Sequence, residues 1–147
     1  MDAKTRFERT RAAVQRLNEV HALLMYDGDD WKPEDVRTST NASDPTASRA
    51  IYAVDELAEK LNALRAEERE LIDLIGESGT IIAAVRKGFG TPYGNLLEWR
   101  YIDCYTWRRI HDDYGITRDC GRYLLDVAFD WIDSVGVSKL LRGQTEL

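Results

Sequence analysis

Apolar residues recur every three or four positions along two stretches of the chain. The first stripe consists of Phe7, Thr10, Val14, Leu17, His21 and Leu24. This spacing places the stripe on one side of an α-helix, so we expect an amphipathic helix in residues 1–26, beginning at about residue 3. Because the stripe is narrow, as in the seam of a coiled coil, it favours pairing with another helix.

A second and longer stripe begins after a polar stretch. Residues 27–47 contain Pro33, Pro45 and many acidic and hydroxyl side chains, and we interpret them as a polar linker. Residues 48–90 predict a long, coiled-coil-like helical segment, whose register is Val54, Leu57, Leu61, Leu64, Glu68, Leu71, Ile75, Ser78, Ile82 and Val85.

Neither long helix can bury its seam alone, so we expect the two to pair within the chain or across a dimer. Gly76 and Gly79 lie inside the second helical pattern, where each glycine costs about 1 kcal/mol relative to alanine. They predict a kink or break, with a short helix resuming at Thr80.

Residues 91–147 predict three shorter helices. Apolar residues between Leu96 and Ile102 indicate the first, and Thr106 is a suitable N-cap for a second helix over Trp107–Tyr114. Gly115 would end that helix, and Thr117 would cap a third, from Arg118 to about Ser134. Since no stretch alternates with the period of a strand, the predicted fold class is all-α, with long heptad-patterned helices and a C-terminal helix-turn-helix bundle.

Residues 106–132 have the pattern of a helix-turn-helix. Gly115 permits the left-handed backbone of a tight turn, and Ile116 can fill the space between the two helices. The first side chains of the second helix would then face a DNA major groove. The predicted DNA-binding residues lie on the first helix and at the beginning of the second: Arg108, Arg109, Thr117, Arg118, Asp119 and Arg122.

The same segment carries a resemblance to known proteins. The residues from Thr106 to Asp119 read TWRRIHDDYGITRD, and with Arg122, Leu124, Ala128 and Phe129 they are similar to the promoter-reading helix-turn-helix of bacterial sigma factors. Over residues 36–135 the chain resembles the ArpU/RinA-type phage regulators, through Ser43–Thr46 (SDPT), the helix from Ile51 and residues 97–103 (LEWRYID). The resemblance implies an all-α, phage- or prophage-encoded transcription regulator without catalytic activity.

Two positions depart from the sigma-like pattern. His111 stands where such motifs have a small residue, and Gly121 stands where they have a branched aliphatic one. We expect these positions to face each other, so that the large side chain fills the volume that the glycine leaves.

The charge of the chain favours a second hypothesis. The net charge is −6, whereas a nucleic-acid-binding domain is usually strongly basic. Four acidic residues on the last long helix (Asp119, Asp126, Asp130 and Asp133) would repel DNA wherever they face it. DNA binding should therefore be weak and salt-dependent. The alternative is an acidic protein-binding module that inhibits or redirects a host nucleic-acid machine, such as RNA polymerase or a defence nuclease.

Other functions find no support in the sequence. It contains no paired carboxylates, nucleophile–base set or phosphate loop, and His21 and His111 lack ligand partners at suitable spacing. We therefore expect no enzymatic activity, no cofactor and no metal. A polar N-terminus and the lack of a long apolar run predict a cytoplasmic protein with no membrane association. The expected partners are double-stranded promoter or operator DNA, a second copy of the chain in a homodimer, and host RNA polymerase or another host protein.

Overall fold

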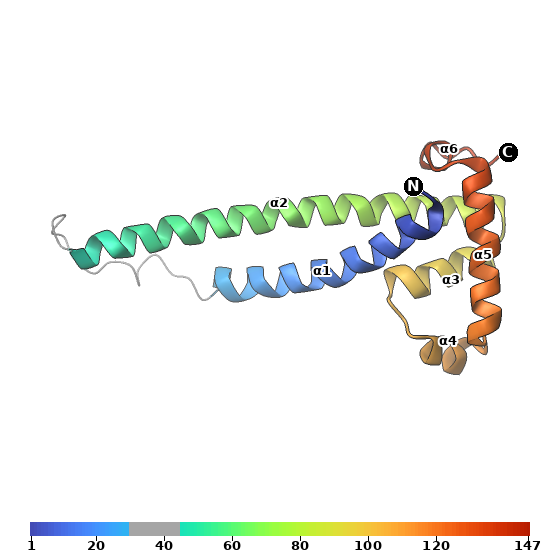
Figure 1. The fold of residues 1–147 in the computed structure, drawn as a ribbon, viewed down its shortest axis with the longest axis horizontal. Helices are drawn as coiled ribbons and strands as arrows, with labels where there is room; N and C mark the ends of the chain where they lie inside the picture. The colour runs from blue at the N-terminus through green and yellow to red at the C-terminus, as the bar shows by residue number, and fades with distance from the viewer. Residues whose placement is uncertain (30–44) are drawn as a thin grey trace. The chain divides into compact units, whose positions relative to one another are not determined.

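A computed structural model describes residues 1–29 and 45–147, which consist of helices and short connections (Figure 1). The elements are α1 (Ala3–Asp29), α2 (Pro45–Gly88), α3 (Thr91–Leu97), the π-helical segment η2 (Glu98–Ile102), α4 (Trp107–Tyr114), α5 (Arg118–Val135) and α6 (Val137–Leu141). No strand occurs in these ranges, and the predicted all-α class is confirmed. Most of the predicted linker, residues 27–47, lies outside the described residues. Within the described ranges, no helix has the length and apolarity that crossing a bilayer requires.

The chain forms two compact units. The first contains residues 1–16 and 71–147, and the second contains residues 17–70. The long helices α1 and α2 each contribute one segment to the first unit and one to the second. All the shorter helices belong to the first unit.

Within each unit, α1 and α2 contact each other through the polar positions of their stripes. In the first unit, the hydroxyl oxygens of Thr10 and Ser78 are buried and 2.6 Å apart. In the second unit, Nε2 of His21 lies 2.8 Å from a carboxylate oxygen of Glu68. Each polar break in one stripe therefore meets a polar break in the other. Of the two pairings that the sequence left open, the structure shows the one within the chain.

Helix α2 is continuous, so the predicted break at Gly76 and Gly79 is wrong. A Cβ atom at either glycine would meet nothing within 4 Å, because both glycines lie on the open side of the helix. On the packed side, Ile82 and Val85 are almost fully buried. The burial of such side chains outweighs the roughly 1 kcal/mol by which each glycine weakens a helix.

The core of the first unit contains side chains from each of the helices described above. Phe7 of α1 packs against two aromatic rings that also contact each other, with centroid distances of 5.6 Å to Tyr101 of η2 and 5.8 Å to Phe129 of α5. The backbone N–H of Ala3 donates to Oδ1 of Asp133 at 2.9 Å. These contacts hold the beginning of α1 against η2 and α5, the elements that surround the candidate site.

Candidate nucleic-acid interface

The predicted caps and turn between α4 and α5 are present. Oγ1 of Thr106 accepts a hydrogen bond from the N–H of Arg109 at 3.2 Å, and Oγ1 of Thr117 accepts one from the N–H of Cys120 at 3.3 Å. Gly115 has a left-handed backbone, with φ 72° and ψ 16°. Ile116 is half-buried against the core, as expected for the residue between the two helices. The chain therefore forms two capped helices joined by a three-residue turn.

The expected pairing of His111 with Gly121 is wrong. Gly121 is buried against the indole of Trp107, since an added Cβ would lie 2.3 Å from Cζ3 of that ring. His111 is exposed, and its Nδ1 lies 3.5 Å from Oδ1 of Asp112. Trp107, at the beginning of α4, therefore fills the space that we assigned to the histidine.

The two arginines predicted on α4 are exposed and lie beside acidic residues of the same helix. Nε of Arg108 lies 3.9 Å from a carboxylate oxygen of Asp112, and Nε of Arg109 lies 3.3 Å from one of Asp113. The guanidinium of Arg109 also stacks on Tyr105, 3.9 Å from the ring centroid. Such exposed pairs contribute little to stability, but each carboxylate offsets the positive charge beside it.

The other predicted residues share the first two turns of α5. Arg118, Asp119 and Arg122 are all exposed, while the hydroxyl of Thr117 is engaged in capping the helix. Among the described residues, no carboxylate lies within 4 Å of the guanidinium of Arg118 or Arg122. The two guanidinium groups are therefore available to an external anion.

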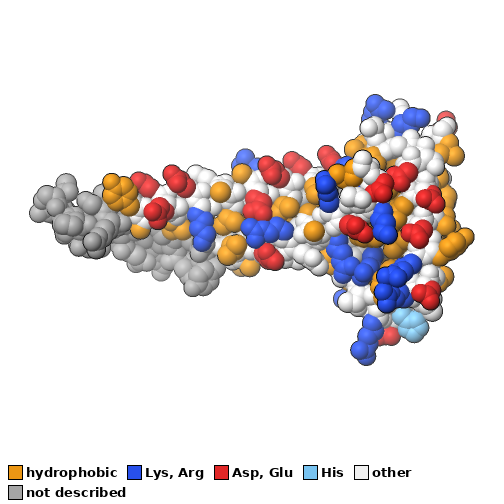
Figure 2. All heavy atoms as spheres, in the orientation of Figure 1, with side chains coloured by type: hydrophobic (Ala, Val, Ile, Leu, Met, Phe, Trp, Pro, Cys, Tyr) orange, Lys and Arg blue, Asp and Glu red, His pale blue; other side chains and the backbone are white. Residues whose placement is uncertain are grey.

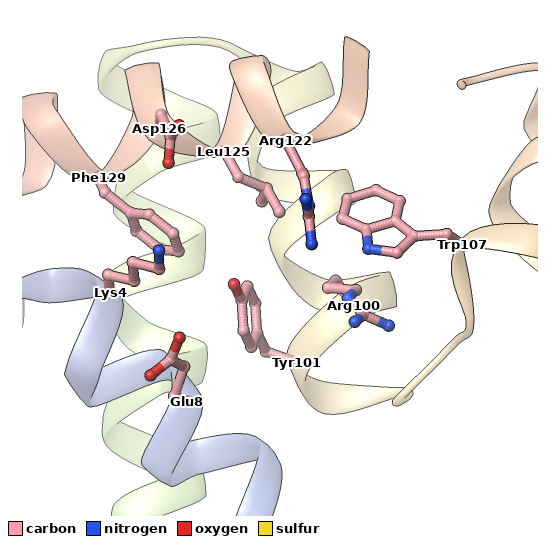
Figure 3. A pocket seen from close by; sticks show the side chains of 9 residues that line it. All are labelled: Lys4, Glu8, Arg100, Tyr101, Trp107, Arg122, Leu125, Asp126 and Phe129. Atoms are coloured by element: carbon pink, nitrogen blue, oxygen red, sulfur yellow. The ribbon is translucent and has the colours of Figure 1, made fainter. Parts of the chain in front are cut away.

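Arg122 also lines a cavity of about 420 Å³ that the sequence analysis did not foresee. Its lining comes from α1, η2, α4 and α5 and comprises Lys4, Glu8, Arg100, Tyr101, Trp107, Arg122, Leu125, Asp126 and Phe129 (Figure 3). A neighbouring cavity of about 250 Å³ shares Glu8, Arg100 and Tyr101 and adds Arg11. The fold therefore brings together arginines from three elements that are far apart in the sequence.

Arg100 is the central member of this group. One of its terminal nitrogens donates to the carbonyl oxygen of Tyr105 at 2.8 Å, and its guanidinium lies 4.8 Å from the centroid of the Trp107 ring. Burial lowers the pKa of Arg100, and the positive charges of Arg11 and Arg122 lower it further. Arg11 and Arg122 therefore lie close enough to Arg100 to disfavour its charged form.

Figure 2 shows Lys and Arg side chains gathered over the part of the first unit where α1, α4 and α5 meet, with acidic side chains among them. Arg11 and Arg100 were missed because no local motif connects them with α5. The excess of Lys and Arg in residues 1–26 indicated that Arg11 could belong to a basic surface. The residues that lie beside Arg11 are determined by the tertiary fold and could not be predicted from this excess.

No protein-family model, curated protein or solved structure matches the chain.

Proposed function

We propose that this protein is a phage-type transcriptional regulator that binds double-stranded DNA through the beginning of α5. The observation that carries the proposal is the pair of exposed guanidinium groups on Arg118 and Arg122. They lie directly after a capped turn, and no carboxylate of the described chain pairs with them. In helix-turn-helix proteins, this part of the second helix enters the major groove, where its side chains contact base edges or the phosphates that border the groove.

The surrounding charges restrict the proposed contact to a small area. Arg108 and Arg109 on α4 would approach the phosphates beside the groove, although Asp112 and Asp113 offset their charge. Further along α5, Asp126 and Asp130 are exposed and would repel the backbone. A few phosphate contacts against a net charge of −6 give weak binding that falls with salt, and each phosphate contact adds about 0.9 to the steepness of log affinity against log salt concentration.

The proposed regulator would act as a homodimer on two half-sites and could also contact host RNA polymerase. Two helix-turn-helix units would read half-sites separated by about one helical turn of DNA. Since the stripes of α1 and α2 contact each other within the chain, the dimer would form through another surface. Analytical ultracentrifugation of the full chain tests this part of the proposal separately from DNA binding.

A pair of matched double variants tests the DNA contact. Arg118→Ala with Arg122→Ala removes two positive charges from the proposed interface. Lys139→Ala with Arg142→Ala removes two exposed charges at α6 and its C-terminal end, so both proteins have the same net charge. In a gel-shift assay at low salt, the first variant should lose the shifted band and the second should keep it. Equal affinity of the two variants would reject Arg118 and Arg122 as contacts.

The exposed acidic row on α5 favours a second candidate function, an acidic module that binds a basic surface on a host protein. Asp119, Asp126 and Asp130 are exposed on this helix. If this candidate is right, the protein should pass through a DNA column at low salt and bind purified host RNA polymerase or a defence nuclease. Replacing Asp126 and Asp130 with asparagine should then weaken that protein complex.

A further inference from the structure

The cavity beside Arg122 is divided by charge. Figure 3 shows Arg100, Arg122 and the indole of Trp107 at one end, and Lys4, Glu8 and Asp126 at the other, with Tyr101 between them. Its volume, about 420 Å³, is within the range of about 300–1,000 Å³ that is typical of small-molecule sites. The cavity therefore has the size of a ligand site and one distinctly cationic end.

The cationic end of the cavity has more N–H donors than hydrogen bonds to protein acceptors. A guanidinium carries five N–H groups, and Arg100 directs one of its terminal nitrogens to the carbonyl of Tyr105. Among the side chains of residues 1–25 and 52–147, no carboxylate pairs with Arg11, Arg100 or Arg122. Glu8 lines both cavities and Asp126 lines the larger one, but neither forms an ion pair with these arginines, so an anion bound directly between the guanidinium groups would offset their positive charge.

We propose that this end of the cavity binds a phosphate group, held between the guanidinium groups of Arg100 and Arg122. Planar guanidinium groups bind phosphate through paired hydrogen bonds, and two of them match the charge of a phosphate dianion. At the other end, the two carboxylates of Glu8 and Asp126 outnumber the single ammonium of Lys4, so this end would disfavour a second anionic group. The part of the ligand that occupies the other end of the cavity is therefore neutral or positively charged.

The phosphate has two possible sources, a small phosphorylated molecule or the backbone of bound DNA. The inference does not rest on the proposed function, because inorganic phosphate alone can serve as the probe. Substitution of Arg100 distinguishes phosphate binding in the cavity from DNA binding at the α4–α5 turn, since Arg100 lines the cavity and lies outside that turn.

The first experiment measures phosphate binding by isothermal titration calorimetry on the full chain, with chloride at matched ionic strength as the reference. Arg100→Gln and Arg122→Gln each remove charge-assisted hydrogen bonds, so each should weaken binding about tenfold or more. Lys139→Gln, on α6, should bind like the unchanged protein. If Arg100→Gln fails to fold by circular dichroism, the exposed Arg122 still provides the test.

The proposal is overturned if the unchanged protein binds no phosphate, or if both glutamine variants bind it as well as the unchanged protein does. A second arm identifies the source by titrating duplex DNA into Arg100→Gln. Weaker DNA binding by this variant, together with competition by free phosphate, assigns the site to the DNA backbone. DNA binding within about twofold of the unchanged protein assigns the site to a small phosphorylated molecule. Loss of DNA binding in every protein, with phosphate binding intact, rejects the proposed function alone.

Discussion

Gly121 shows how one missing side chain shapes the candidate site. The glycine lies on the buried face of α5, where a Cβ atom would lie 2.3 Å from Cζ3 of Trp107. The indole is rigid, and it also lines the cavity beside Arg100. Any larger residue at position 121 must therefore displace a wall of the cavity. Gly76 differs, because it lies inside α2 with open space around it.

Alanine at these two glycines should have opposite effects on stability. Gly121→Ala should lower the free energy of unfolding by about 1–3 kcal/mol, because overpacking outweighs the gain in helix propensity. Gly76→Ala should raise it by about 0.5–1 kcal/mol, since only the propensity changes. Urea denaturation followed by circular dichroism measures both. Stabilisation of similar size by the two variants would show that Trp107 is not packed against α5.

The buried phenol of Tyr101 should make the stability of the fold depend on pH in the alkaline range. Burial raises the pKa of its phenol from 10.0 to about 12. Between these two values the unfolded chain gives up the proton and the folded chain keeps it, so its contribution to stability is full below pH 10 and declines toward pH 12. From pH 10 to pH 12, the free energy of unfolding of Tyr101→Phe should therefore decline less than that of the unchanged protein. Urea midpoints measured across it test the effect, and identical declines in the two proteins would contradict it.

At the scale of the elements, the parts predicted correctly depend on local chemistry. Thr106 and Thr117 cap helices because a hydroxyl reaches an N–H three residues ahead, and Gly115 ends α4 because it tolerates a left-handed backbone. The stripes of α1 and α2 likewise follow from the helical repeat. Each of these signals lies within a few residues of the feature that it predicts.

The errors and omissions concern contacts between distant segments. Glycine propensity predicted a break in α2, but the packing of its opposite face keeps the helix continuous. The partner of Gly121 was misassigned because the sequence does not show that Trp107 points toward it. Arg100 and Arg122 belong to different elements, and only the tertiary fold reveals that they line one cavity.

The pairing of Thr10 with Ser78 predicts a non-additive effect at the contact between α1 and α2. Thr10→Val alone leaves the buried hydroxyl of Ser78 without its partner and should cost about 1–3 kcal/mol. The double variant, with Ser78→Ala added, should recover much of this loss, because both polar groups are then gone. Unfolding free energies of the two single variants and the double variant measure the coupling. Purely additive losses would mean that the hydroxyls do not interact.

At the scale of the molecule, the charge distribution governs what the protein can bind. The chain has a net charge of −6, yet Arg11 and Arg122 are close enough to Arg100 to lower its pKa, and Arg118 lies one helical turn from Arg122. The acids that accompany them are Glu8 of α1 and further acidic residues of α4 and α5. DNA binding therefore depends on a small cationic area within an anionic molecule, which makes ionic strength the most informative variable.

The most direct test is the affinity of the full chain for a fluorescent DNA duplex, measured by anisotropy from about 50 to 200 mM salt. Our account predicts binding at the lowest salt, with the logarithm of the affinity falling linearly against the logarithm of the salt concentration. Replacing Arg118 and Arg122 with alanine should reduce that slope by about two, because each arginine would neutralise one phosphate. Absence of binding at the lowest salt, or a slope that the double variant leaves unchanged, would contradict it.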